Sequence, residues 1–281
     1  MKGLRARRRE RLLELDEVER RLKPFGRRYL GVREIPLDAL VGTDGRASSF
    51  TRDFRPLHAF SRDRMRSLEG AFADGGFPPI VTVKLGETYF VIDGHHRAAL
   101  ARRRGAEMID ADVTELVARV PLPAGADMLE VVLRELERIF VEDSGLAEAR
   151  PGVRVPVSRP AHYLELLENV QVHGYHMMRD RGRVLENAEI AANWYDAIYE
   201  PTLAAIDRLQ LGREYRDAPA GDLFLVLHRH RRDAFPSTGC PHLAQTVVSV
   251  IGDGGRRRRR LRLPGRGRPS PSWRGRVWSR T

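Results

Sequence analysis

The spacing of apolar residues changes along the chain, and this change predicts two parts of different structural class. In "PPIVTVKLGETYFVIDG", two short apolar runs flank Gly86-Glu87, which predicts a β-hairpin. From residue 127 onward, apolar residues recur every three or four positions over long stretches, which predicts helices. Residues 121–126 separate the two patterns and have the composition of a linker.

Turn residues and glycines predict where the other helices and strands of the first part of the chain begin and end. "YLGVREIPLDALVG" predicts a strand followed by a turn, and residues 61–72 predict a helix that a pair of glycines ends. Another predicted helix, over 95–104, follows the hairpin, and "MIDADVTEL" predicts one more strand. These elements predict an α+β domain over residues 29–120.

The rest of the chain divides into three segments. Residues 127–235 predict a second, mostly α-helical domain. Residues 1–28 set leucine and valine among many charges, which predicts a basic amphipathic helix docked on the body; a basic arm for nucleic acid or anionic lipid is the alternative. Residues 236–281 are low-complexity and rich in Arg, Gly, Pro and Ser, so we expect a disordered basic tail.

Charge is distributed unevenly between these segments. The chain has 49 basic and 38 acidic residues, a net charge of +11. Residues 254–281 hold eleven arginines and no acid, and residues 1–28 hold eleven basic and five acidic residues, which leaves residues 29–253 at −6. Because nucleic-acid affinity depends mostly on neutralising phosphates, we expect nucleic acid to bind only the two ends. For the tail, the alternative is that it contributes nothing specific.

Composition also predicts where the protein resides. Cys240 is the only cysteine, so no intrachain disulfide can form. No run approaches the ~20 apolar residues that span a bilayer, and the basic start lacks the apolar core of a secretory signal. We expect a cytoplasmic protein without a transmembrane segment, and leave its oligomeric state open.

The turn "DGHHR" gathers polar groups where a predicted strand becomes a helix. A helix N-terminus offers unpaired N–H groups and a partial positive charge, and so favours an anion. Gly94 lets the backbone approach a ligand, and Arg97 can donate two hydrogen bonds to a phosphate. His95 and His96 can donate as well, and Asp93 can bind a divalent metal or a hydroxyl. The turn therefore predicts a phosphate site; the alternative is that Asp93 only caps the helix.

Residues 30–116 resemble the N-terminal domain of the ParB/sulfiredoxin superfamily, most specifically at the turn just described. The resemblance implies the fold of that domain and a phosphate-binding role for the turn. Sulfiredoxins have Gly-Cys-His-Arg there, and His95 stands in place of their catalytic cysteine, so repair of sulfinic acid is excluded. Chromosome-partition proteins, which are CTP-dependent clamps, match only at Gly94 and Arg97.

The turn is most similar to that of ParB-fold free-serine kinases, which have Asp-Gly-His-x-Arg. Those kinases place a catalytic glutamate shortly after their first strand, and its nearest counterpart in "VGTDGR" is Asp44, which is shorter by one methylene. The resemblance thus implies Asp44, Asp93 and His95 as catalytic residues.

Residues and resemblance together predict a nucleotide-binding protein. We expect a nucleoside di- or triphosphate (ATP/ADP or CTP) on Gly94, His95, His96 and Arg97, with Mg²⁺ on Asp93. Phosphoryl transfer or nucleotide hydrolysis is the expected reaction. The alternative is a non-catalytic partition or transcription regulator in which nucleotide switches DNA or partner binding.

The second half resembles a helical domain of unknown function from high-GC bacteria. The resemblance is carried by "SRPAHYLELLENVQVHGYHMMRDRG", "AEIAANWYDAIYEPTLAAI" and "DLFLVLHRHRR". It implies an architecture and a bacterial source, but no activity.

Overall fold

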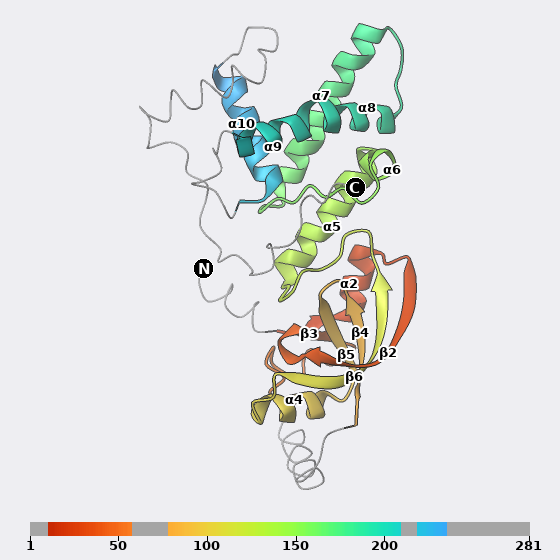
Figure 1. Ribbon diagram of the computed structural model, residues 1–281, viewed down its shortest axis with the longest axis vertical. Coiled ribbons are helices and arrows are strands. Elements are labelled where there is room, and N and C mark those ends of the chain that lie inside the picture. Colours follow the sequence, from red (N-terminus) through yellow and green to blue (C-terminus); the bar gives the residue numbers. More distant parts are fainter. Residues whose placement is uncertain (1–10, 58–77, 209–217, 235–281) are drawn as a thin grey trace, which may run out of the picture. The chain divides into compact units, whose positions relative to one another are not determined.

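A computed structural model describes residues 11–57, 78–208 and 218–234 of the chain (Figure 1). Its contacts divide the chain into two compact units that separate between Glu135 and Leu136. The first unit is built on a six-stranded sheet, and the described residues of the second form helices and loops. The mixed α/β organisation expected from the sequence is therefore present, while the predicted helix over 61–72 and the predicted tail lie outside the described residues.

The sheet of the first unit has the strand order β1-β3-β5-β4-β6-β2. Its strands are β1 (Leu13–Glu14), β2 (Gly26–Pro36), β3 (Leu40–Thr43), β4 (Ile80–Leu85), β5 (Thr88–Asp93) and β6 (Met108–Val117). Strands β4 and β5 form the predicted hairpin, and β2 pairs antiparallel with β6. Strand β3, which follows the 3₁₀ turn η1 (Leu37–Ala39), was predicted only as a turn; it runs parallel to both β1 and β5.

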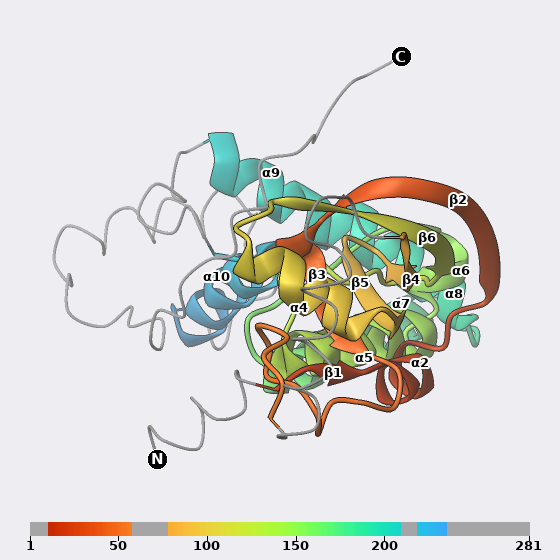
Figure 2. The ribbon, with the colours of Figure 1, turned by 90° about the horizontal axis from the view of Figure 1, so that it is seen from below.

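Helices pack against both faces of this sheet. Helix α4 (His95–Arg103) lies on one face of the sheet (Figure 2). On that face it buries Ala98 and Leu100 against apolar side chains of β4, β5 and β6. Helix α2 (Leu15–Leu22) buries Val18 and Leu22 on the opposite face. The predicted N-terminal helix is thus shorter than expected within the described residues, because Leu13 and Glu14 pair with β3 instead of continuing the helix.

Strand β2 forms one edge of the sheet and is eleven residues long. Its pairing with β6 shifts register between Tyr29 and Gly31, which leaves Leu30 as a bulge. Gly31 adopts a positive φ of 75°, a conformation that glycine adopts without steric cost. The bulge bends the strand and interrupts its regular pattern of hydrogen-bonding groups.

The segment predicted as a linker packs on the first unit. Leu122 and Ala126 are buried with the α2 face of the sheet. The N–H of Glu87, in the hairpin turn, donates to the Leu122 carbonyl over 2.8 Å. A Cβ atom on Gly86 would lie 2.2 Å from that oxygen, so only glycine allows this approach. Two apolar side chains therefore hold the predicted linker on the first unit.

Helices dominate the described residues of the second unit. They are α5 (Met128–Asp143), which begins in the first unit, α6 (Leu146–Ala149), α7 (Ala161–Arg181), α8 (Asn187–Trp194), the π-helix η2 (Tyr195–Tyr199), α9 (Glu200–Arg208) and α10 (Ala220–Ala234). Trp194 and Tyr199 stack at 5.1 Å between ring centroids, and Phe224 packs on both rings. Among the described residues, no helix combines the length and apolar character needed to cross a membrane.

Candidate functional site

Two parallel strands bring Asp44 and Asp93 to the same end of the sheet. Asp93 is the last residue of β5, and Asp44 follows the last residue of β3 directly. Thr43 pairs with Val91 in register, and the Asp44 N–H donates to the Val91 carbonyl over 3.1 Å. Both carboxylates are exposed. Residues that are far apart in the sequence therefore lie beside the start of α4.

Gly94 makes the connection from β5 to α4 in a conformation that favours glycine. Its φ of 94° and ψ of 20° are left-handed. A Cβ atom there would lie 2.5 Å from Cγ2 of Ile80, so the position has no room for a side chain. The first helical hydrogen bond runs from the Ala98 N–H to the Gly94 carbonyl over 2.9 Å. The turn thus brings strand and helix into close contact.

The first turn of α4 keeps its backbone donors uncapped. No side chain among the described residues caps this N-terminus. The Asp93 carboxylate, which could have capped it, accepts a hydrogen bond from Arg97 Nη2 at 2.6 Å instead. The arrangement differs from the capping alternative, and the N–H groups of the first turn keep their capacity to bind an anion.

Arg97 is held in place by backbone as well as by Asp93. Its Nη1 donates to the carbonyls of Pro78 and Pro79 over 2.9 and 2.7 Å. The Arg97 side chain is 16% exposed, whereas that of Asp93 is 73% exposed. One guanidinium nitrogen is thus fixed by the protein, while the other engages a carboxylate that solvent can reach.

His95 points away from solvent, into the core. Its side chain is buried, its Nε2 shares a hydrogen bond with Thr43 Oγ1, and its ring stacks on Phe50 at 5.4 Å. Burial, and to a lesser degree the nearby charge of Arg46, lower the pKa of His95 from 6.5 to about 4. The imidazole is therefore neutral near pH 7. Its predicted contact with phosphate and its catalytic role stay predictions.

His96 is half-buried, and its ring meets Phe50 edge-on with 5.2 Å between centroids. Phe50 therefore contacts both histidines of the turn. The predicted contact of His96 with phosphate also stays a prediction.

Sequence reasoning missed two charged residues near the turn. The Glu14 carboxylate, at the end of β1, accepts hydrogen bonds from the N–H groups of Gly45 and Ala47 over 3.0 and 2.9 Å and so shapes the loop that carries Asp44. Arg46 lies in that loop, is exposed, and is close enough to affect His95. No local signal marks either residue, since Glu14 sits in a stretch with helical periodicity and Arg46 is one of many arginines.

Few protein side chains near the turn could bind a metal ion. Within the described ranges, no group of three or more His, Cys, Asp or Glu side chains could hold a metal ion. Asp44 and Asp93 are exposed carboxylates beside the turn. This donor set fits Mg²⁺, which commonly takes one or two carboxylates and completes its shell with water and phosphate oxygens.

Comparisons with known proteins find only weak structural similarities. No protein-family model and no curated protein matches the chain. The structure of the C2221 form of a Pnob8-like ParB-N domain is similar at 11% identity and a TM-score of 0.22, over 75% of this chain and 83% of that chain. The structure of the pNOB8-like ParB N-domain is similar at 11% identity and a TM-score of 0.23, over 75% and 78%. At these TM-scores the similarity supports no conclusion about the fold or about the role of the turn.

Proposed function

We propose that the β5–α4 turn binds the phosphates of a nucleoside di- or triphosphate together with Mg²⁺. The proposal depends on one observation: an uncapped helix N-terminus lies beside a guanidinium that the backbone holds in place. N–H groups, the helix dipole and an arginine together favour a phosphate.

Each residue of the turn has a separate task in this proposal. Arg97 keeps Nη1 on the proline carbonyls while Nη2 exchanges Asp93 for a phosphate oxygen. Asp93, once released, turns its exposed carboxylate to Mg²⁺ or to a ribose or substrate hydroxyl. His95 is a positioning residue, because its neutral, buried ring fixes the start of α4 against Thr43. His96 lies beside the phosphates at the same turn.

Asp44 is the proposed general base for an acceptor hydroxyl or water. Its carboxylate is exposed and lies at the same end of the sheet as Asp93. Phosphoryl transfer needs mainly positioning and charge neutralisation, and the first turn of α4 with Arg97 and Mg²⁺ supplies both.

A thermal-shift panel with ATP, ADP, CTP and GTP in the presence of Mg²⁺ tests binding. A nucleotide at a hundred times its Kd should stabilise the wild-type chain by about 2.7 kcal/mol. Arg97→Ala should abolish that shift. Arg103→Ala, at the other end of the same helix, should keep it and serves as the matched control. If no nucleotide stabilises the wild-type chain, the proposal is wrong.

Phosphate release separates an enzyme from a switch. In the proposed reaction, Asp44→Asn keeps nucleotide binding but loses transfer or hydrolysis. Binding without any turnover by the wild-type chain would instead favour the non-catalytic regulator.

A further inference from the structure

One face of the sheet is covered over only part of its area. Leu85 and Leu116 are buried under α2 on this face. On the same face, along β4 and β6 and on the neighbouring β2, four apolar side chains are exposed by 68, 60, 40 and 38%, namely Tyr29, Val32, Val81 and Met108. Register places them together: Val32 and Val81 both pair with Asp112, and that aspartate is close enough to Tyr29 to raise the pKa of the tyrosine hydroxyl.

Acidic side chains accompany these apolar ones. Glu34 and Asp110 are exposed and lie directly opposite each other on β2 and β6. Like charges in that position destabilise a strand pair. Among the described residues, no lysine or arginine forms an ion pair with Glu34 or Asp110. We call this surface the acidic face; it consists of Tyr29, Val32, Glu34, Val81, Met108, Asp110 and Asp112.

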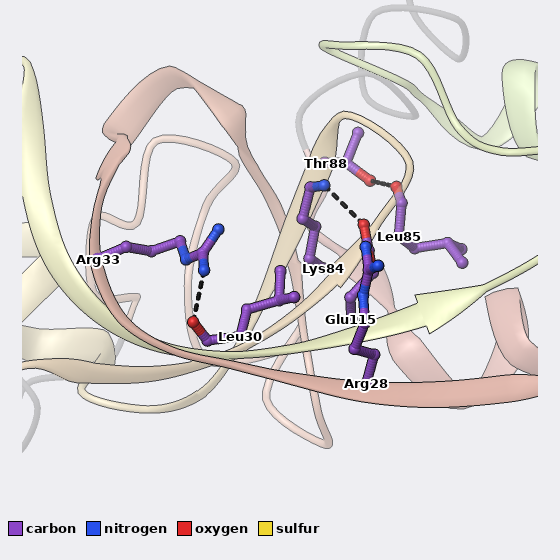
Figure 3. A network of polar contacts seen from close by, with 7 residues as sticks. All are labelled: Arg28, Leu30, Arg33, Lys84, Leu85, Thr88 and Glu115. Carbon is purple, nitrogen blue, oxygen red and sulfur yellow. Dashed lines mark hydrogen bonds and ion pairs between the residues drawn. The ribbon is translucent and has the colours of Figure 1, made fainter.

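The opposite face of the same strands shows how such charge is normally compensated. There, Lys84 and Arg28 approach the Glu115 carboxylate from the two neighbouring strands (Figure 3). Lys84 Nζ lies 2.7 Å from Glu115 Oε1. Cations are thus paired with acid on one face, while the acidic face has an excess of carboxylates.

We propose that the acidic face binds the chain's own arginine-rich segment, residues 254–281. This segment holds eleven arginines and no acid, while residues 29–253 carry a net charge of −6. Its arginines alternate with Leu261 and Leu263 and are followed by Trp273 and Trp278. Guanidinium groups pair with the carboxylates, and the apolar side chains cover exposed valine and tyrosine.

The acidic face extends to the end of the sheet that carries the candidate site. Val81 pairs in register with Asp93, so the acidic face adjoins the β5–α4 turn. The inference is independent of the proposed function, because it rests on charge and exposure and holds whether or not the turn binds nucleotide.

Tryptic release of the segment from the full chain tests the proposal. At low ionic strength, mass spectrometry should detect cleavage after Arg256–Arg276 at least about tenfold faster in Asp110→Asn/Asp112→Asn than in wild type, since the variant loses the charges that hold the segment. In 1 M salt the two rates should converge.

Matched variants separate this effect from a general loss of charge. Glu186→Gln/Asp207→Asn removes two exposed acids from the second unit and should be cleaved at the wild-type rate. Glu34→Lys, an exposed change on β2, should accelerate cleavage like the Asp110/Asp112 pair, and thermal unfolding verifies that each variant folds. Equal rates in all four proteins at low salt would overturn the proposal, as would equal acceleration by the control pair.

Discussion

The two units each bury an ionisable side chain almost completely, but they deal with its charge in opposite ways. In the first unit, His95 is 2% exposed and contacts Thr43 and Phe50, and its lowered pKa keeps it neutral. In the second unit, Glu137 is fully buried and accepts hydrogen bonds from Arg154 Nε and Nη2 over 2.8 and 2.7 Å. The N–H of Val155 adds a third, over 2.9 Å.

This difference shows what burial demands of a charged group. A buried base without an acidic partner is kept neutral, so the free energy of unfolding depends on the pH at which that base would bind a proton. A buried acid that faces a guanidinium keeps its charge in an ion pair. The free energy of unfolding then depends on the presence of that guanidinium. At the candidate site the buried histidine is neutral, so Asp93 and Arg97 are the charged groups of the turn.

The largest effect is expected where the buried ion pair is broken. Glu137→Gln removes the negative charge but leaves the Arg154 guanidinium, and should lower the free energy of unfolding by about 4 kcal/mol. Urea denaturation measures the change. Glu186→Gln, at an exposed position of the same unit, should change it by less than about 0.5 kcal/mol. Equal changes in the two variants would mean that the Glu137–Arg154 ion pair contributes no more to the free energy of unfolding than an exposed acid does.

His95 should make stability depend on pH. Its pKa is about 4 in the folded chain and 6.5 as the ordinary value, so between these values the unfolded chain binds more protons. Stability is therefore complete above pH 6.5 and falls toward pH 4, by about 3 kcal/mol in total. Unfolding measured across this range should show the fall in wild type and in His176→Asn, and a flatter profile in His95→Asn. An unchanged slope in His95→Asn would place the titration elsewhere.

Gly94 should matter more than a glycine with free space. Gly94→Ala combines a left-handed conformation with a Cβ contact of 2.5 Å, whereas Gly105, with a φ of 75°, has nothing within 4 Å. We expect Gly94→Ala to cost about 3 kcal/mol of unfolding free energy and Gly105→Ala about 1 kcal/mol. Thermal unfolding of both compares them. Similar costs would show that Ile80 moves aside and that the turn does not fix the position of His95.

The smallest effect is expected at Tyr199. Its hydroxyl is buried and has no hydrogen-bond partner within the described part of the chain, and burial raises its pKa. Tyr199→Phe removes a polar group that loses hydration without compensation, so it should leave the chain equally stable or up to about 1 kcal/mol more stable. Urea denaturation of Tyr199→Phe and Glu137→Gln compares a buried hydroxyl without a hydrogen-bond partner with a buried carboxylate that has several. A clear loss of stability would reveal a partner for the hydroxyl.

Much of the fold was predictable because it depends on local patterns. The hairpin of β4 and β5, helix α4 with Gly105 after it, strand β6 and the helices of the second unit all follow from period and stop signals. Strands β1 and β3 were not predicted, since each is short and is stabilised only by pairing with a distant strand. The division into units also lies later than the composition suggested, because Leu122 and Ala126 pack on the sheet.

The candidate site was predictable only in its residues. "DGHHR" identifies the turn, but not that His95 points inward while Asp93 engages Arg97. These orientations depend on Phe50, Thr43 and the carbonyls of Pro78 and Pro79, which reach the turn through tertiary packing. A local pattern specifies which side chains are present, and the surrounding strands decide which of them face solvent.

The bulge in edge strand β2 affects how copies of the protein can aggregate at high concentration. A long, straight edge offers its backbone to any neighbouring strand and so seeds fibrous aggregates. In β2, the kink at Leu30 breaks that template, and the exposed, charged side chains of Arg27, Arg28 and Arg33 lie on either side of the kink. The bulged residue Leu30 thus disfavours amyloid-like stacking of copies through this edge.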